Sequence, residues 1–207
     1  MSNSKVAEVY ASTSLDEQES TYDEWAANYE QDLCAMGYRI PMMISAVFAR
    51  YVPADAGPIL DAGCGGGIQA EAIHALGYGP ITGIDLSAGM LEIAQGKEIY
   101  ADLQQAVLGE HLDFPDDQFA ALFSTGTITQ GHAPPNSFDE LIRITQPGAP
   151  IVFSLREDEG MDPAYMQAIV QHETEGRWTQ VYSSPQFLSM PYGEPDVIHR
   201  VHVYRVN

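Results

Sequence analysis

The chain has 207 residues, a length usual for one domain with a sizeable buried core. It carries 9 Lys+Arg against 29 Asp+Glu, a formal net charge of −20, which excludes electrostatic binding to DNA, RNA or an anionic membrane. Its 45% hydrophobic and 10% aromatic content excludes an intrinsically disordered chain.

The positions of the cysteines and histidines indicate the redox compartment of the protein and whether it binds a metal. Cys34 and Cys64 form neither a C-x-x-C pair nor a metal-like pair with a nearby histidine, which argues against a disulfide scaffold and fits a reducing compartment. The N-terminal stretch lacks the apolar core of a secretory signal, and no apolar run approaches membrane-spanning length. We therefore expect a cytoplasmic protein, a monomer or a homodimer, with no membrane partner. We also expect no bound metal, because metal-ligand spacing is absent from His74, His111, His172, His199 and His202.

Helix signals dominate the first quarter of the chain. Ser14-x-x-Glu17 and Thr21-x-x-Glu24 both have the capping-box pattern, which predicts two helix starts. A further apolar helix is predicted over residues 41–52, with a proline at its start. We expect residues 1–53 to form a helical cap over the carboxyl edge of a sheet.

From residue 58 onward, short apolar runs alternate with helical patterns, which predicts right-handed βαβ units and a mostly parallel sheet. The last two strands are joined by a Pro/Gly-rich segment, residues 184–196, so the last strand is expected to be antiparallel. The fold class is therefore α/β: a Rossmann-like, open, mostly parallel seven-stranded sheet with helices on both faces. Residues 58–207 form its core, and residues 1–207 a single domain. The strands are predicted at residues 59–62, 81–84, 105–108, 120–124, 151–155, 178–182 and 201–206.

Three helices of this core have recognisable starts or spans. Ser87 is placed to cap the helix that follows the second strand, since its hydroxyl can accept from an orphan backbone N–H. Asn136 with Asp139 starts the helix after the fourth strand, and residues 162–175 form the helix after the fifth.

A glycine-rich loop follows the first predicted strand, and ligands of open α/β sheets bind at this edge. The loop, Asp61 to Gly67, reads DAGCGGG, and its glycines permit a tight turn and close backbone approach to a ligand. The second strand ends in Asp85, 22 residues after Gly63. An acidic side chain there can accept both hydroxyl hydrogens of a ribose.

Two cofactor classes use such a loop. Dinucleotide binders have G-x-G-x-x-G, but counting from Gly63 places Ile68 where the last glycine belongs, and counting from Gly65 slides the turn into the helix. An acid just before the glycines would repel a pyrophosphate, whereas it suits the ammonium of a methionyl group. Asp61 therefore favours S-adenosylmethionine (SAM).

Four segments, ILDAGCGGG, GIDLSAGML, DFPDDQFAAL and DELIRITQPG, resemble in their order the motifs of class I SAM-dependent methyltransferases, over about residues 20–156. Three more, YDEWAANYEQDL, STGTITQGH and VFSLRED, are similar to the methyltransferase-like proteins of the Williams–Beuren critical region and their bacterial relatives. The resemblance implies SAM as cofactor, S-adenosylhomocysteine (SAH) as product, and no settled substrate.

The resemblance also implies roles for individual residues. Asp61 would lie near the SAM amino group, through a water, and Asp85 would bind the ribose hydroxyls. The backbone of the glycine loop would contact the methionyl part. The adenine would lie between two pairs of residues, and aromatic residues of the first helix would close the pocket. The remaining members of the expected cofactor site are Tyr22, Tyr29, Gly63, Cys64, Gly65, Leu86, Met90, Val107, Leu108 and Thr125.

Some of these residues also have simpler readings. Tyr22, Trp25 and Tyr29 could be a core stripe, and Cys64 a small packed residue. Many relatives carry an acid at the place of Val107, where it accepts from the adenine amino group. A backbone group must replace that acid here.

Two residues are candidates for acceptor chemistry. His132 follows the fourth predicted strand at the mouth of the expected site, where a neutral imidazole could take a proton from a substrate. It could equally order the loop or line the pocket. Arg156 follows the fifth strand and could clamp a substrate carboxylate, or could pair with Glu157 or Asp158.

The sequence therefore favours a SAM-dependent methyltransferase acting on a small-molecule acceptor, with no nucleic-acid partner. The alternative from a different class is a catalytically silent SAM- or SAH-binding protein, in which the acceptor pocket beside the cofactor site would be closed. An NAD-linked oxidoreductase is a third reading, which Ile68 disfavours.

Overall fold

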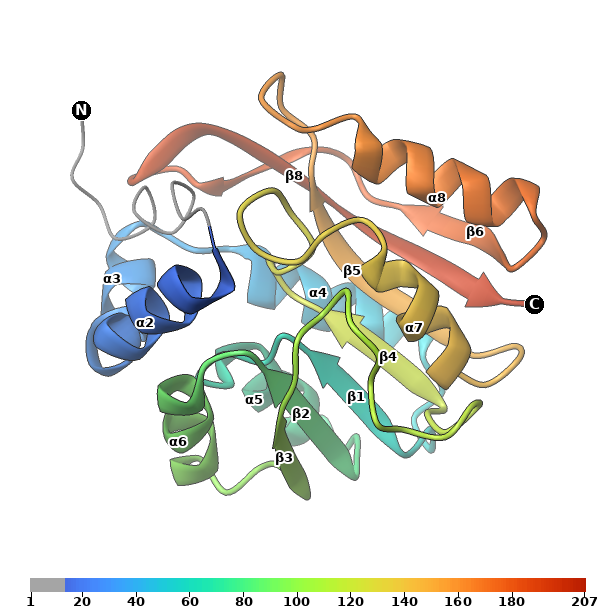
Figure 1. The fold of residues 1–207 in the computed structure, drawn as a ribbon, viewed down its shortest axis with the longest axis horizontal. Helices are drawn as coiled ribbons and strands as arrows, with labels where there is room; N and C mark the ends of the chain where they lie inside the picture. Colours follow the sequence, from blue (N-terminus) through green and yellow to red (C-terminus); the bar gives the residue numbers. More distant parts are fainter. Residues whose placement is uncertain (1–13) are drawn as a thin grey trace.

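A computed structural model describes residues 14–207 of the chain (Figure 1). Helices and strands alternate along most of it, and two hairpin-linked strands end it. The elements, in chain order, are α2 (Leu15–Trp25), the 3-10 turn η1 (Ala26–Asn28), α3 (Tyr29–Ala35), α4 (Ile40–Tyr51), β1 (Ile59–Ala62), α5 (Ile68–Ala75), β2 (Ile81–Asp85), α6 (Ala88–Gly96), β3 (Asp102–Gln105), β4 (Ala121–Ser124), α7 (Ser137–Ile144), β5 (Pro150–Arg156), α8 (Ala164–Thr174), β6 (Trp178–Ser183), β7 (Phe187–Met190) and β8 (Glu194–Val206).

The strands form one sheet in the order β3-β2-β1-β4-β5-β8-β6, with β7 paired to β8. The first five strands of the chain pair in parallel, and β8 pairs antiparallel with β5, β6 and β7. The chain order reverses between β1 and β4, which places a topological switch point, the usual ligand edge of such sheets, beside β1. The predicted α/β class, the parallel majority and the antiparallel last strand are confirmed.

The predicted number of strands was wrong, because the sheet has eight strands and not seven. The extra strand, β7, lies in the segment that was expected to be an irregular connection. Met190 and Gly193 close a turn between β7 and β8, since the Gly193 N–H donates to the Met190 carbonyl. The last strand accordingly starts at Glu194, well before the predicted residue 201. Proline and glycine in this stretch mark the turn and the edge of a hairpin.

The third strand was predicted at residues 105–108 and lies at Asp102–Gln105. The position of β3 is set by its pairing with β2, because residues 82–85 of β2 lie opposite residues 102–105. Since β3 is an edge strand, its side chains are partly exposed and polar, so the apolar run after it gave a misleading signal.

Helices cover both faces of the sheet. On one face, α4 and α5 pack their apolar residues, among them Phe48 and Ile73, against Phe123, Val152 and Val201 of the sheet. The other face has a second core that includes α7 and α8, with large buried side chains supplied by Phe138, Phe153, Trp178 and Tyr204.

The N-terminal helices divide into two groups. Ser14 caps α2 as predicted, with its hydroxyl accepting from the Glu17 N–H. Thr21 starts no second helix: it lies inside α2, and its hydroxyl donates to the Glu17 carbonyl. Figure 1 shows α2 and α3 beside α6 at one end of the sheet. Helix α4 lies on the sheet face instead, so the expected cap of residues 1–53 is reduced to α2, η1 and α3 within the described residues.

Candidate functional site

A cavity opens at the ends of β1, β2, β3 and β4, beneath α2 and α3, and we call it the sheet-edge cavity. It holds about 740 Å³ of empty space, part of which is open to solvent. Its walls come from the glycine loop, from the ends of the strands and from the helical cap. The lining residues are Leu15, Gln18, Tyr22, Tyr29, Tyr38, Gly63, Gly65, Gln69, Asp85, Leu86, Met90, Ala106, Val107, Leu108, Thr125, Gly126, Thr127, His132 and Ala133.

Two glycines shape the floor of the cavity. Gly63 has φ +76°, and a Cβ there would lie 2.3 Å from Cγ2 of Thr127, so no side chain fits. Gly65 has φ +49°, and a Cβ there would meet nothing within 4 Å. The first glycine allows close packing with the loop after β4, and the second leaves open space over the backbone.

Asp85 is held at the end of β2 by two backbone N–H groups. One carboxylate oxygen accepts from Gly65 at 2.7 Å, and the other from Ser87 at 3.0 Å. Burial raises the pKa of Asp85, and the N–H groups of Ser87 and Gly65 oppose this shift. The same segment starts α6, because the Ser87 hydroxyl accepts from Met90 N–H as the predicted cap. The carboxylate is thus fixed at the cavity wall by the backbone around it.

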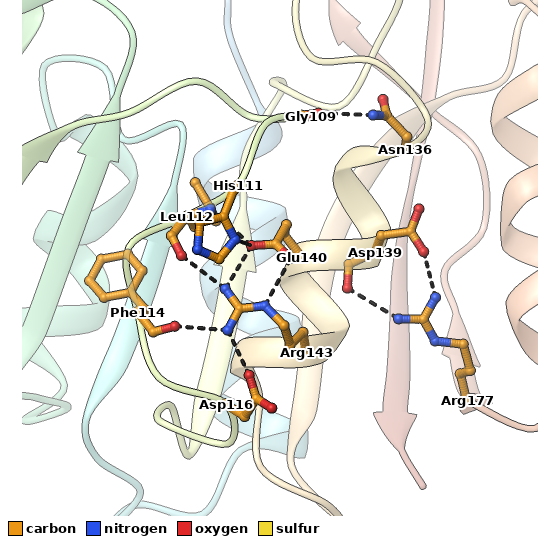
Figure 2. Close-up of polar contacts among 10 residues, drawn as sticks. All are labelled: Gly109, His111, Leu112, Phe114, Asp116, Asn136, Asp139, Glu140, Arg143 and Arg177. Carbon is orange, nitrogen blue, oxygen red and sulfur yellow. Dashed lines mark hydrogen bonds and ion pairs between the residues drawn. The ribbon is translucent and has the colours of Figure 1, made fainter.

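The loop after β3 forms another wall of the sheet-edge cavity. Hydrogen bonds attach this loop to α7 (Figure 2). Asn136 donates to the Gly109 carbonyl at 2.9 Å, and Glu140 accepts from the Leu112 N–H at 2.9 Å. Arg143 donates to the carbonyls of Leu112 and Phe114 at 2.9 and 2.8 Å. These bonds fix the loop in which Val107 and Leu108 reach the cavity.

Asp61 lies beneath the glycine loop and does not line the cavity. Its carboxylate accepts from the Tyr100 hydroxyl at 2.7 Å and, at 3.4 Å, from Nε2 of Gln69. Gln69 does line the cavity, and the same amide nitrogen donates to the Cys64 carbonyl at 2.6 Å. Burial raises the pKa of Asp61 to about 7, although Tyr100 and Gln69 lower it.

Comparison with known proteins identifies the fold around this cavity. Over residues 60–153, which contain the glycine loop and Asp85, the sequence matches the family described as a methyltransferase domain. Human methyltransferase-like protein 27 is 36% identical over 141 residues, which cover 65% of this chain and 56% of the human protein. Over this region the chain resembles the class I SAM-dependent methyltransferases.

Other relatives of this chain are bacterial enzymes. A malonyl–acyl-carrier-protein O-methyltransferase from Yersinia pestis is 33% identical over 106 residues, covering 50% of this chain and 38% of the relative. The chain thus spans about half the length of the human relative and less of the bacterial one. Among solved structures, a TehB-like SAM-dependent methyltransferase from Corynebacterium glutamicum has a TM-score of 0.65 at 19% identity, covering 91% of this chain and 100% of the other. This last likeness concerns the fold.

His132 lines the sheet-edge cavity from the loop after β4. It is half-buried, its ring lies 5.9 Å from that of Tyr22, and its Nδ1 lies 3.4 Å from the Gln130 carbonyl. Burial lowers the pKa of His132 to about 4, so the imidazole is neutral near pH 7. Tyr22 and Tyr29 line the cavity, whereas Trp25 is buried behind them, so this aromatic group serves both the wall and the core.

Besides Asp61, two further expected site residues, Cys64 and Arg156, lie outside the cavity lining. The Cys64 thiol is buried under the loop, where it donates to the Gly65 carbonyl at 3.6 Å, and burial raises its pKa. Arg156 forms a bidentate pair with Asp158, at 2.6 and 2.8 Å, which matches the simpler of its two readings. The structure therefore offers no carboxylate clamp at Arg156 toward this cavity.

Several lining residues escaped the sequence analysis. Gln69, Tyr38 and Thr127 belong to helices and loops whose patterns fit ordinary core or surface positions. Of these three, only Gln69 could have been found from the sequence. An amide directly after a glycine loop can donate to the loop's carbonyls, as Gln69 does here to Cys64.

Two further features of residues 14–207 concern membranes and metals. No helix in that range has the length and apolarity that a membrane span requires. Within the same part of the chain, no three His, Cys, Asp or Glu side chains converge as metal ligands would.

Proposed function

We propose that this protein transfers a methyl group from SAM to a small-molecule acceptor, and that SAM binds in the sheet-edge cavity. The observation that carries the proposal is the convergence of the glycine loop, Asp85 and the β3–β4 wall on one cavity within the matched methyltransferase region. SAM, when bound, supplies a methyl group on a positively charged sulfur; the acceptor takes the methyl, the sulfur becomes a neutral thioether, and the acceptor's proton is released.

The residues present fit this cofactor. The open space over Gly65 leaves room for a chain against the loop backbone. Thr125 lines the cavity, and its hydroxyl is buried without a hydrogen-bond partner among the described residues, so a ligand can satisfy it. Asp85 would accept from ribose hydroxyls with the lone pairs that Gly65 and Ser87 leave free.

The rest of the cofactor would be held by apolar and aromatic contacts. Leu86 and Met90 on one side, and Val107 and Leu108 on the other, would enclose the adenine. Asp61 would act on the methionyl ammonium through Gln69 or a water, since Gln69 stands between Asp61 and the cavity. Tyr22 and Tyr29 would close the site, with their ring faces favourable to a sulfonium.

His132 would serve the acceptor. A neutral imidazole with a pKa near 4 is a hydrogen-bond partner for a hydroxyl and a weak base. Alignment of the acceptor and exclusion of water would supply most of the rate, because the methyl donor is already activated.

A second cavity favours an enzyme over a silent binding protein. It holds about 440 Å³ of empty space, part of which is open to solvent, and it shares Tyr22, Tyr29, Tyr38, Gly126 and His132 with the sheet-edge cavity. We call it the adjoining cavity. A protein that bound only SAM or SAH would need no such space beside its cofactor.

The lining chemistry favours a small acceptor over nucleic acid. Of the described residues that line the two cavities, none is lysine or arginine. Phosphate contacts need such cations, and the net charge of −20 repels a polyanion.

Calorimetric titration with SAM and SAH tests the proposal, with NADH as the control ligand. We expect binding of both sulfur ligands at micromolar concentration and no NADH binding. Asp85→Asn should weaken SAH binding at least about tenfold through loss of a charged acceptor, whereas Asp55→Asn, at an exposed site before β1, should bind as the parent does. Absence of SAM and SAH binding to the folded protein would contradict the proposal.

A further inference from the structure

The adjoining cavity lies where the helical cap meets the β7–β8 hairpin. Five residues line the adjoining cavity but not the sheet-edge cavity: Trp25, Leu33, Ile40, Met190 and His199. The same junction is packed by a buried apolar cluster that includes Trp25, Leu33, Met190 and Val197. The cavity is thus built from elements outside the matched methyltransferase region, residues 60–153, apart from Gly126 and His132.

The two cavities share one wall. His132 and Gly126 line both of them, as do Tyr22, Tyr29 and Tyr38. A molecule in the adjoining cavity would therefore present one end to the sheet-edge cavity near His132, and its other end would lie toward β8. This arrangement fits an acceptor whose reacting group meets the methyl donor at the shared end.

His199 lies on the wall that only the adjoining cavity has. Its side chain is buried, with 3% exposed, and comes from β8 opposite Arg156 of β5. Within residues 14–207, its Nδ1 has no hydrogen-bond partner. A buried polar atom without a partner costs free energy, so a ligand that forms a hydrogen bond with it in this cavity gains affinity.

The cavity favours an uncharged aromatic occupant. Its lining includes the rings of Tyr22, Trp25 and Tyr29, whose centroids lie 4.7 to 6.3 Å apart. Its described lining includes no Asp, Glu, Lys or Arg, so neither a carboxylate nor an ammonium would find a counter-charge. Burial keeps both His132 and His199 neutral near pH 7, since it lowers the pKa of each to about 4.

We propose that the adjoining cavity is the acceptor pocket, and that it selects a neutral aromatic compound with two hydroxyl groups. One hydroxyl oxygen, at the His132 end, forms a bond to the methyl carbon as the bond from that carbon to the SAM sulfur breaks, and the hydroxyl proton passes by way of His132 to solvent. The other pairs with His199 at the far end and fixes the orientation of the ring. His199 is thus a specificity residue on the acceptor. This inference rests on the proposed function, because the pocket has an acceptor only if the sheet-edge cavity holds the donor.

The test uses the whole chain loaded with SAH, so that binding is measured without turnover. The probes are the isomeric dihydroxynaphthalenes, naphthol with one hydroxyl, and anionic naphthoate. We expect at least one dihydroxynaphthalene to bind about tenfold more tightly than naphthol, because a polar site discriminates against a ligand that leaves it unpaired. We expect no measurable binding of naphthoate. With SAM in place of SAH, the preferred dihydroxynaphthalene should gain one methyl group.

Three variants assign the preference to His199. His199→Phe should remove the tenfold preference while leaving SAH affinity unchanged, since His199 lies outside the sheet-edge cavity. His199→Gln should keep part of the preference, because an amide can still pair with a hydroxyl. His172→Gln, at a buried histidine of α8 that lines neither cavity, should keep all of it.

The outcomes separate the two proposals. If SAH binds but naphthol and every dihydroxynaphthalene bind equally in the parent protein, or naphthoate binds best, the acceptor inference is wrong and the proposed function stands. If the preference exists but survives in His199→Phe, His199 is not the specificity residue. If SAH does not bind to the folded protein, both proposals fail. The preference for dihydroxynaphthalene over naphthol is measured in the unmodified protein. It therefore tests the proposed ligand class even if a variant fails to fold.

Discussion

At the scale of single residues, burial in this protein moves ionisations well away from their usual pH. Asp61, Asp85, His132 and His199 all lie at or beneath the two cavities, and burial is the first cause of each pKa shift. For both acids burial disfavours the carboxylate, and for both histidines it disfavours the imidazolium. These shifts have opposite consequences for stability as pH changes, which makes the residues separable by experiment.

His132 should titrate at about pH 4 and not near 6.5. Its pKa is lower folded than unfolded, so its contribution to stability is present above about pH 6.5 and is lost as the pH falls toward 4. Histidine NMR titration measures this directly, with the resonance assigned by its absence in His132→Gln. A His132 resonance that titrates near 6.5 would show that the imidazole is solvated and would remove the basis for its neutral role.

Asp61→Asn should stabilise the protein at high pH. The Asp61 pKa is raised to about 7, so the carboxyl favours folding most below about pH 4, and this contribution is lost as the pH rises toward 7. An asparagine can still accept from the Tyr100 hydroxyl and carries no charge. The gain over the parent should reach at most about 4 kcal/mol at pH 8 and vanish near pH 4.

Urea unfolding at both pH values measures this gain. Asp55→Asn, at an exposed position, should change stability little and equally at the two pH values. A variant less stable than the parent at pH 8 would show that the Asp61 charge is compensated within the fold.

At the scale of elements, the sequence was most informative where one local pattern decides one structure. Ser14 and Ser87 cap their helices as predicted, because capping depends on residues three positions apart. The position of β3 depends instead on pairing with β2, and the hairpin of β7 and β8 depends on distant strand contacts. Single-sequence patterns do not encode such partners, and edge strands lack the apolar signal of buried ones.

The attachment of the β3–β4 loop to α7 gives an element-scale prediction. Glu140 has a pKa lowered to about 2, first because of its hydrogen bond with Arg143. The pair therefore stabilises the fold above about pH 4.5, and this stability is lost as the pH falls toward 2. Glu140→Gln should cost about 1–3 kcal/mol at pH 7, since it removes one of the two carboxylates that pair with Arg143 and leaves only Asp116.

The measurement is urea unfolding of Glu140→Gln and the parent at pH 7 and near pH 3, where the difference between the two should be smaller than at pH 7. Glu110→Gln, an exposed position in the same loop, is the matched control. We also expect weaker SAH binding in Glu140→Gln alone, because Val107 and Leu108 would lose their fixed position. Equal stability of Glu140→Gln and the parent at pH 7 would show that the other loop bonds suffice.

At the scale of the whole molecule, the candidate site draws on parts of the chain that differ in how well sequence predicts them. Eleven of the expected residues do line the sheet-edge cavity: Tyr22, Tyr29, Gly63, Gly65, Asp85, Leu86, Met90, Val107, Leu108, Thr125 and His132. Their binding roles stay predictions. Sequence reasoning passed over His199, because its neighbours in the adjoining cavity come from α2, α3 and β7, and such convergence is a property of the assembled fold.

The cap closes over the site through polar contacts with α6 and the neighbouring loop. The Asp23 carboxylate of α2 accepts from the Ser87 hydroxyl at 2.5 Å and from the Gly89 N–H at 2.9 Å, at the start of α6. Lys97, just after α6, pairs with Glu30 of α3 at 2.8 Å and with Glu71 of α5. These contacts hold Tyr22 and Tyr29 over the cavity.

Ligand binding and cap closure should therefore stabilise each other. A ligand that touches both the sheet edge and the cap binds the closed form better, so it must favour closure by the same free energy. We expect SAH to slow proteolysis within α2 and α3. Asp23→Asn should speed that proteolysis without ligand and raise the SAH dissociation constant about threefold to tenfold, as loss of a charge-assisted cap contact implies. Asp55→Asn should do neither. Unchanged SAH affinity in Asp23→Asn, together with faster cleavage of its cap, would mean that the cap covers the site without contributing to cofactor binding, and would leave it as a wall of the acceptor pocket alone.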